Sequence, residues 1–179
     1  MLAVTSEASQ NVVLVHPVRG EVLGAISTGV GGSHMVAVTS DGSTLYTGDM
    51  QAGTVSRLDV ASRSKSRSYQ VPATPEAITV SPDGSQVWAG SNARGLVSVV
   101  DTETGEVDSG LSGFEWPYRI LILEERDLVV IPDMGLSAVR FVNYSARSDI
   151  ETLQLPGEGP QGVALTRDRG TLFLSLSRS

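Results

Sequence analysis

The stretch "TPEAITVSPDGSQVWAG", residues 74–90, decides how this chain is interpreted. Two short apolar runs, "AITV" and "QVWAG", are joined by the tetrapeptide "SPDG". Asp-Gly between apolar runs predicts a tight hairpin turn, in which Gly84 can supply a positive φ. We therefore expect Asp83 to be a turn residue rather than a catalytic acid, and Val80 and Trp88 to lie in the core.

The same pattern recurs along the chain. Its copies begin at Gly32, Thr74, Trp116 and Gly159, at steps of 42, 42 and 43 residues. The downstream segments keep the same interval, and they begin at Val12, Val55, Val97 and Val139. A repeat of about 40–45 residues that contains four short strands is typical of a propeller blade.

Hydrophobicity falls from the first strand of each repeat to the fourth. The first strand, such as "AITV", is nearly all apolar, which suits a strand covered on both faces. The second strand carries an aromatic or aliphatic residue at one position: Tyr46, Trp88, Val129 and Phe173. The fourth strand, such as "DIETLQL", is the most polar, as expected of an outer edge. The sequence thus predicts an all-β propeller of four-stranded antiparallel blades, with its innermost strands sandwiched.

Composition narrows the possible functions. The chain has 179 residues, of which 40% are hydrophobic and 18% charged, so it can bury a core. A net charge of −7 disfavours a nucleic-acid partner. The lack of cysteine excludes disulfides, thiolate nucleophiles and cysteine-ligated metals. No apolar run is long enough for a membrane span, and "MLAVTSEASQ" does not read as a secretory signal.

These repeats resemble the YVTN family of β-propeller repeats, found in surface-layer-like and related exported bacterial and archaeal proteins. The family pattern is roughly Pro-x-Gly-Val-Ala-Val-Ser-Pro-Asp-Gly, a Tyr-Val strand, then Val-Ser-Val-Ile-Asp. Residues 74–107 match it best and "SHMVAVTSDG" matches well, whereas "LEERD", residues 123–127, replaces the Asp-Gly turn of the third copy. The resemblance spans nearly the whole chain and implies an extracytoplasmic location, periplasmic or at the cell surface. It is weak evidence for function, because propellers host many activities.

The repeats divide the chain into one propeller domain, 1–179. The expected units are a partial blade at 1–31, blades at 32–73, 74–115 and 116–158, and a partial blade at 159–179. That makes about four blades, and the resemblance implies part of a larger ring of about seven. A closed small ring and the assembly of open arcs through their blade edges are the alternatives.

Candidate ligand-binding residues follow the proline landmark Pro75, Pro117 and Pro160, whose place Ser33 takes in the first copy, where the chain enters each innermost strand at the channel face. This position is polar in every copy while the following residues are mostly apolar, and its occupants are His34, Glu76, Tyr118 and Gln161, with Arg119 beside them. Such a ring can hold a small polar ligand, an anion or a metal. The alternative is a wet channel mouth without function. We expect no metal or other cofactor.

Other polar residues fit turns. Asp59, Asp101 and Asn143 end the third strands and suit turns that bind backbone amides, and His16 takes the same position. In the loop after the second strand, Asp49, Asn92 and Asp133 also favour turn chemistry over cation binding. Trp116 is either an exposed contact residue or a plug between blades.

Three function classes remain open. No catalytic motif is recognisable, so we expect no catalytic residues and a non-enzymatic scaffold that binds a protein or small polar ligand at the channel face. One alternative is a propeller enzyme or cofactor-protein subunit, lactonase-like or quinoprotein- or haem-d1-like. In that case His34, Glu76 and Arg119 would be its acid, base and anion-holding groups. Another is a structural cell-surface repeat.

Overall fold

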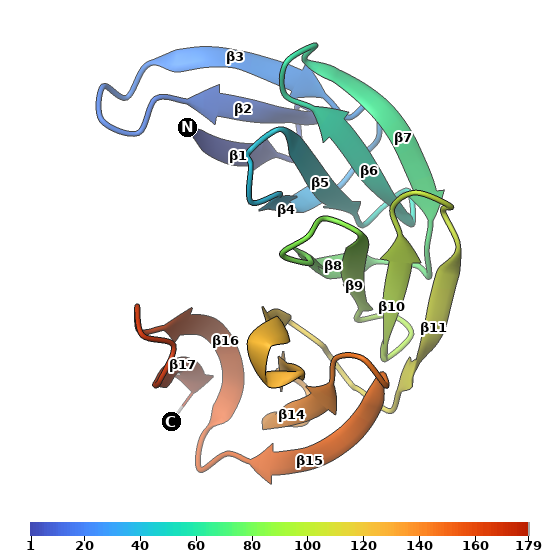
Figure 1. The fold of residues 1–179 in the computed structure, drawn as a ribbon, viewed down its shortest axis with the longest axis vertical. Helices are drawn as coiled ribbons and strands as arrows, with labels where there is room; N and C mark the ends of the chain where they lie inside the picture. Colours follow the sequence, from blue (N-terminus) through green and yellow to red (C-terminus); the bar gives the residue numbers. More distant parts are fainter. Residues whose placement is uncertain (179) are drawn as a thin grey trace.

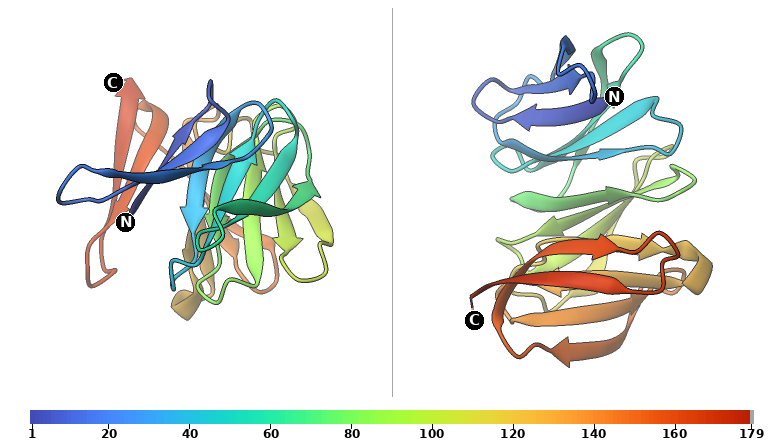
Figure 2. Two further views of the ribbon diagram at one scale, coloured as in Figure 1. Left: turned by 90° about the horizontal axis from the view of Figure 1, so that it is seen from above. Right: turned by 90° about the vertical axis from the view of Figure 1, so that its left-hand side faces the viewer.

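The computed structural model describes residues 1–178, and within them it contains 17 β-strands and one short 3-10 helix. The strands form five antiparallel sheets that follow one another around an open arc (Figure 1). Consecutive sheets face each other (Figure 2), and we call them blades I to V. This confirms the predicted all-β propeller of four-stranded antiparallel blades. None of the described helices is long and apolar enough to cross a membrane.

Three blades have four strands each, which run in chain order from the inside of the arc to the outside. Blade II consists of β4 (Ser33–Val38), β5 (Thr44–Asp49), β6 (Thr54–Asp59) and β7 (Ser64–Gln70). Blade III consists of β8 (Pro75–Val80), β9 (Gln86–Ser91), β10 (Leu96–Asp101) and β11 (Val107–Ser112). Blade IV consists of β12 (Leu121–Leu123), η1 (Glu124–Arg126), β13 (Leu128–Asp133), β14 (Ala138–Asn143) and β15 (Ser148–Gln154).

The two terminal sheets are smaller. Blade I consists of β1 (Leu2–Ser6), β2 (Asn11–Val15) and β3 (Val22–Ser27). Blade V consists of β16 (Glu158–Leu165) and β17 (Leu172–Arg178). These two sheets are not hydrogen-bonded to each other, and the arc is open between them (Figure 1). The described chain is therefore not a closed four-bladed ring, and a larger ring stays a prediction.

The β8–β9 hairpin shows what Asp83 does. Its carboxylate accepts hydrogen bonds from the Ser81 hydroxyl at 2.6 Å and the Ser85 amide at 3.0 Å. Gly84 has a φ of +78°, which suits glycine. The Ser81 hydroxyl, followed by the Ser85 groups, holds the pKa of Asp83 below its ordinary value. Asp83 is a turn residue, as predicted.

The aromatic position of the second strand lies in the core, as predicted for Trp88, but in blade IV it is occupied by Val130 and not by Val129, because Trp88 and Val130 are both the third residues of their strands. The Trp88 side chain is fully buried and stacks on Tyr144 of blade IV, with ring centroids 5.8 Å apart. Val80, by contrast, is only partly buried. The innermost strands, predicted to be covered on both faces, are buried only in part. All of β5 is buried, whereas most of β4 is only partly buried, because β4 lies at the inner rim of the arc and water reaches it.

The outer strands β7, β11 and β15 are largely exposed, which confirms the predicted polar edge. Blade IV departs from the repeat at its innermost strand. Its segment "LEERD" forms η1 with Asp127 in the left-handed conformation, at a φ of 51°. Pro117 pairs with Asp133 only through an isolated bridge, and the regular part of β12 is short, from Leu121 to Leu123.

The third-strand turns follow the prediction. His16 Nδ1 accepts hydrogen bonds from the amides of Val18 and Arg19, at 3.3 and 3.2 Å. Asp101 accepts the amide of Thr104 at 2.7 Å in the equivalent turn of blade III. His16 therefore replaces an acidic turn residue structurally.

Candidate functional site

Three of the five predicted site residues sit on β-bulges. In each of three innermost strands, the pairing with the neighbouring strand skips one residue. The skipped residue is His34 in β4, Glu76 in β8 and Gln161 in β16. A bulge leaves its residue out of the ladder and redirects the side chain. The same local distortion thus turns a polar side chain out of three different blades at the same end of the innermost strand.

Close packing between blades fixes these segments. A Cβ atom on Gly90 of β9 would lie 2.9 Å from the carbonyl oxygen of Pro117 and 3.0 Å from the Cβ atom of Ala77. Only a residue without a side chain leaves room for the entry segment of the next blade to approach this closely. This approach places Trp116 of the blade IV entry segment against blade III.

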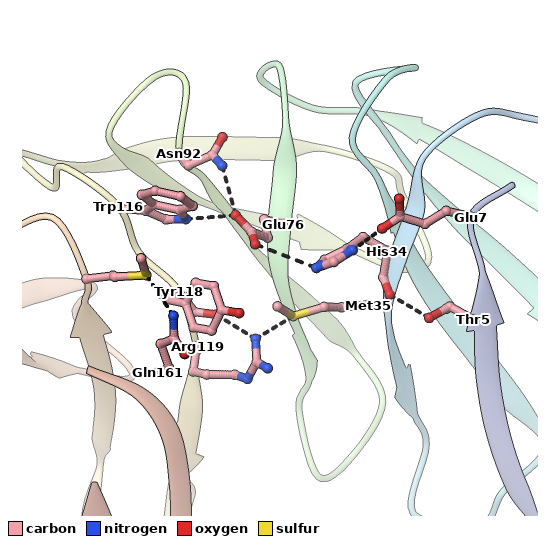
Figure 3. A network of polar contacts seen from close by, with 11 residues as sticks. Thr5, Glu7, His34, Met35, Glu76, Asn92, Trp116, Tyr118, Arg119 and Gln161 are labelled. Atoms are coloured by element: carbon pink, nitrogen blue, oxygen red, sulfur yellow. Dashed lines mark hydrogen bonds and ion pairs between the residues drawn. The ribbon is translucent and has the colours of Figure 1, made fainter. Parts of the chain in front are cut away.

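Glu76 is the centre of the network drawn in Figure 3. It is only 5% exposed, and its Oε2 accepts hydrogen bonds from Asn92 Nδ2 at 2.8 Å and Trp116 Nε1 at 2.7 Å. Its Oε1 faces His34 Nε2 at 3.6 Å, which is ion-pair range but longer than a hydrogen bond. No described residue donates a hydrogen bond to Oε1, so this oxygen can still accept one.

His34 lies between two carboxylates from neighbouring blades. Its Nδ1 is hydrogen-bonded to Glu7, in the turn after β1, and its Nε2 faces Glu76. Its carbonyl oxygen accepts the Thr5 hydroxyl at 2.5 Å. An imidazolium can donate to both carboxylates, whereas a neutral imidazole can donate to only one. The ring therefore connects blades I, II and III at the channel face.

Arg119 provides the positive charge of the site. Its Nη1 donates to Met35 Sδ at 2.9 Å and to the Tyr118 carbonyl at 3.0 Å, and its Cζ lies 4.5 Å from the centroid of the Tyr118 ring. Within residues 1–178, no carboxylate forms an ion pair with Arg119, and its Nε and Nη2 donate to no atom. The guanidinium is thus oriented through one nitrogen while the other two remain available.

The predicted residues do not form a single cluster. His34 and Glu76 face each other, and Arg119 packs on Tyr118. The two pairs adjoin through Met35 and through Trp116, whose ring meets Tyr118 edge-on at 6.3 Å. Gln161 is more remote, and its only described side-chain contact of this kind is Nε2 to Met134 Sδ at 3.6 Å.

Glu7 is a site residue that the sequence pattern did not indicate. Asp49, Asn92 and Asp133 are predicted to lie in the loop after the second strand, and Asn92 does so, whereas Asp49 and Asp133 are the last residues of β5 and β13. The corresponding end of β9 is Ser91, so Asn92 lies one residue beyond it, and Glu7 follows Ser6 in the same way. Ser6 and Ser91 stand where blades II and IV have an aspartate, and this difference is the sequence signal that the following residue, Glu7 or Asn92, carries the polar contact. Trp116 is partly exposed, and its indole donates a hydrogen bond from blade IV to Glu76 of blade III.

A pocket of about 330 Å³ adjoins the network on the side of blade V. Trp116 and Met134 line it together with Glu158 and Ser177. Among the described residues, no group of three or more histidine or acidic side chains is arranged to hold a metal ion. Space for a small molecule therefore lies next to Trp116.

The chain matches no protein-family model and no curated protein. Its fold is similar to that of hydrazine synthase from Kuenenia stuttgartiensis, a propeller-containing protein, with a TM-score of 0.79 and 20% sequence identity. The match covers 94% of this chain and 50% of that chain, so the chain spans about half the length of this neighbour. Many other solved chains also match. At this identity the similarity establishes the fold alone, and the YVTN resemblance is not confirmed.

Proposed function

We propose that this chain is a non-enzymatic propeller scaffold whose channel face binds a small polar ligand that carries an anionic group. The observation that carries the proposal is Arg119. It is held in place by Met35 and Tyr118, it has no carboxylate partner among residues 1–178, and it keeps Nε and Nη2 available. A guanidinium that presents two adjacent nitrogens suits a carboxylate or phosphate, which can accept both hydrogen bonds.

Glu76 supports a second requirement on the ligand. Its Oε1 has no hydrogen-bond donor in the described chain, and it lies in the network that also contains Arg119 (Figure 3). A donor on the ligand would form a charge-assisted hydrogen bond with this oxygen, which is stronger than a bond between neutral groups. The proposed ligand therefore has a hydroxyl or amino group besides its anionic end.

Ligand binding can be tested by isothermal titration calorimetry with citrate, inorganic phosphate and L-glutamate as probes. Arg119→Met removes the charge but keeps an unbranched side chain over Tyr118. We expect it to weaken binding of the best probe about tenfold or more, since a charged hydrogen bond contributes roughly 1.5–3 kcal/mol. Arg94→Met, at an exposed position of the β9–β10 loop, is the matched control and should bind normally. Equal affinities of wild type and Arg119→Met would contradict the proposal.

One observation favours a second candidate, a propeller enzyme. The His34 ring stands between Glu7 and Glu76, and such a ring can hold or deliver a proton at Nε2. The experiment is to assay lactone hydrolysis and metal content. Turnover that is lost in His34→Gln would support an enzyme, whereas a metal-free and inactive chain that still binds the anionic probes would favour the scaffold.

A further inference from the structure

At each junction of the arc, one pair of cross-strand neighbours faces the following blade. The pair is Ala3 and Leu14 in blade I, Tyr46 and Arg57 in blade II, Trp88 and Val99 in blade III, and Val130 and Phe141 in blade IV. Three of these pairs are apolar and pack in the hydrophobic clusters between blades. Blade II is the exception, because it has a guanidinium where the other blades have an aliphatic or aromatic side chain.

Arg57 forms no polar side-chain contact in the described chain. It is partly buried, it forms no ion pair, and its guanidinium donates to no atom of residues 1–178. The neighbouring Arg67 of β7 behaves differently, since it donates to the carbonyl oxygens of Glu103 and Thr104 of blade III at 2.7 and 2.8 Å. Arg67 therefore joins blades II and III, whereas the donors of Arg57 remain available.

Tyr46 and Arg57 line a pocket of about 330 Å³ between blades II and III. The turns of the β4–β5 and β8–β9 hairpins form its other walls, and the Ser40 hydroxyl of the first turn donates to the Pro82 carbonyl of the second at 3.0 Å. These turns lie at the opposite ends of the innermost strands from the channel-face residues. Neither terminal sheet contributes a residue to the pocket, which is thus separate from the site at the channel face.

Two aspartates in the pocket wall supply acceptors. Asp41 accepts the Thr39 hydroxyl on Oδ1 at 2.6 Å, whereas no described residue donates to its Oδ2. The Thr39 hydroxyl lowers the pKa of Asp41 to about 2. The Ser81 hydroxyl likewise lowers the pKa of Asp83, so both carboxylates are ionised at neutral pH. Together with Arg57 they give the wall two negative charges and one positive charge, which disfavours a free anion as the ligand.

We propose that this pocket binds a monosaccharide, with Arg57 and Asp41 as its recognition residues. A neutral sugar meets no net repulsion there, and each of its hydroxyl groups can both donate and accept a hydrogen bond. One sugar hydroxyl accepts from the Arg57 guanidinium and a neighbouring hydroxyl donates to Asp41 Oδ2, which gives two charge-assisted hydrogen bonds. The volume of the pocket is in the range of small-molecule sites.

Two-dimensional amide NMR spectroscopy tests the site with D-glucose, D-galactose and D-mannose as probes, each titrated separately. We expect at least one of these sugars to shift the amide signals of Asp41, Gly42 and Gly84 in the two turns. The amide signals of His34 and Glu76 should stay in place, because the channel face lies at the other end of the strands. Citrate and inorganic phosphate should leave the turn signals unchanged.

Arg57→Leu is the principal variant, since leucine occupies the equivalent position in blade I as Leu14, and circular dichroism should show an unchanged fold. We expect it to weaken binding of the best sugar about tenfold or more, because a charged hydrogen bond is lost. Asp41→Asn places an amide nitrogen or a neutral oxygen where the available carboxylate oxygen was, and it should also weaken binding. Arg94→Leu removes the same charge at an exposed position outside the pocket, and it should bind sugar like wild type.

The proposal would be overturned if none of the three sugars shifted the turn signals, or if Arg57→Leu bound the best sugar as tightly as wild type does. Turn signals that respond to phosphate or citrate but to no sugar would also overturn it, because Arg57 would then hold an anion. Equal weakening by Arg57→Leu and Arg94→Leu would contradict a specific contact and indicate a general effect of charge.

Discussion

Asp133 and Glu76 are buried carboxylates that both accept a hydrogen bond from Trp116, one from its backbone amide and one from its indole. Asp133 is completely buried, and the amides of Glu115, Trp116, Gly135 and Leu136 donate to it at 2.9–3.2 Å. Glu76 accepts only side-chain donors, and only on Oε2. The first carboxylate holds two backbone segments together, whereas the second holds side chains around an oxygen that can still accept a hydrogen bond.

This difference separates a structural carboxylate from a candidate binding one. Asp49, the repeat counterpart of Asp133, is equally enclosed, because hydroxyl groups of Ser33, Thr47, Thr54 and Ser56 donate to its two oxygens. A carboxylate with every oxygen satisfied from within the blade has no capacity left for a ligand. Glu76 has that capacity. Separate measurements of stability and of ligand binding therefore test whether the two carboxylates have different roles.

The largest effect is expected for Asp133→Ala. Removing the carboxylate leaves four backbone amides without an acceptor inside the molecule, so the free energy of unfolding should fall by about 3–4 kcal/mol. Urea denaturation followed by circular dichroism measures the loss. Asp133→Asn keeps one acceptor oxygen and should lose only about half as much. A loss below about 1 kcal/mol in Asp133→Ala would contradict the structural role.

Glu76→Ala should have a smaller effect on stability, about 1–2 kcal/mol, because Asn92 and Trp116 are partly exposed and water can replace the lost acceptor. A double-mutant cycle with Trp116→Phe, which keeps an aromatic ring but lacks the indole N–H, should give a coupling of about 1 kcal/mol by urea denaturation. If Glu76→Ala proves as destabilising as Asp133→Ala, the distinction between the two carboxylates is wrong.

The smallest effect concerns the exposed hairpin aspartates. The Thr39 hydroxyl lowers the pKa of Asp41 to about 2, and the Ser81 hydroxyl lowers the pKa of Asp83. A carboxyl whose pKa is lower in the folded state stabilises the fold above its unfolded pKa of about 4, and this contribution is lost as the pH falls through the folded value. The melting temperature should therefore decrease between about pH 4 and pH 2.

The double variant Asp41→Asn, Asp83→Asn should flatten part of that decrease when the melting temperature is recorded by circular dichroism against pH. Glu151→Gln, on the exposed strand β15, removes one negative charge outside the hairpins and serves as the control. An identical pH profile for wild type and the double variant would rule out a contribution from these turns.

Much of the fold could be predicted because the same strand and turn patterns occur in several copies of the repeat. Asp83 and Gly84 form the same kind of turn that Asp41 and Gly42 form one repeat earlier, so a turn was the consistent interpretation. The burial order was predicted less well. An apolar run such as β4 looks fully enclosed in sequence, but its position at the inner rim depends on how the sheets are arranged around the arc.

The candidate site was predictable in part. The polar position after the proline landmark identified His34 and Glu76, which the structure places face to face. The partners Glu7, Asn92 and Trp116 come from the ends of other strands in three different blades, and their spacing along the chain carries no direct information about contact. The stacking of blades brings Glu7 to His34 and Trp116 to Glu76, whereas Asn92 reaches Glu76 within blade III, through the pairing of β8 with β9.

The sequence by itself determined the strands, their hairpin turns and the grouping of strands into blades, because each of these depends on interactions between residues close along the chain. The tertiary structure decided which polar groups share hydrogen bonds and how deeply each strand is buried. Those outcomes depend on the packing of one blade against the next. The hydrogen bonds that Glu76 accepts and the orientation of Arg119 are therefore properties of the assembled arc.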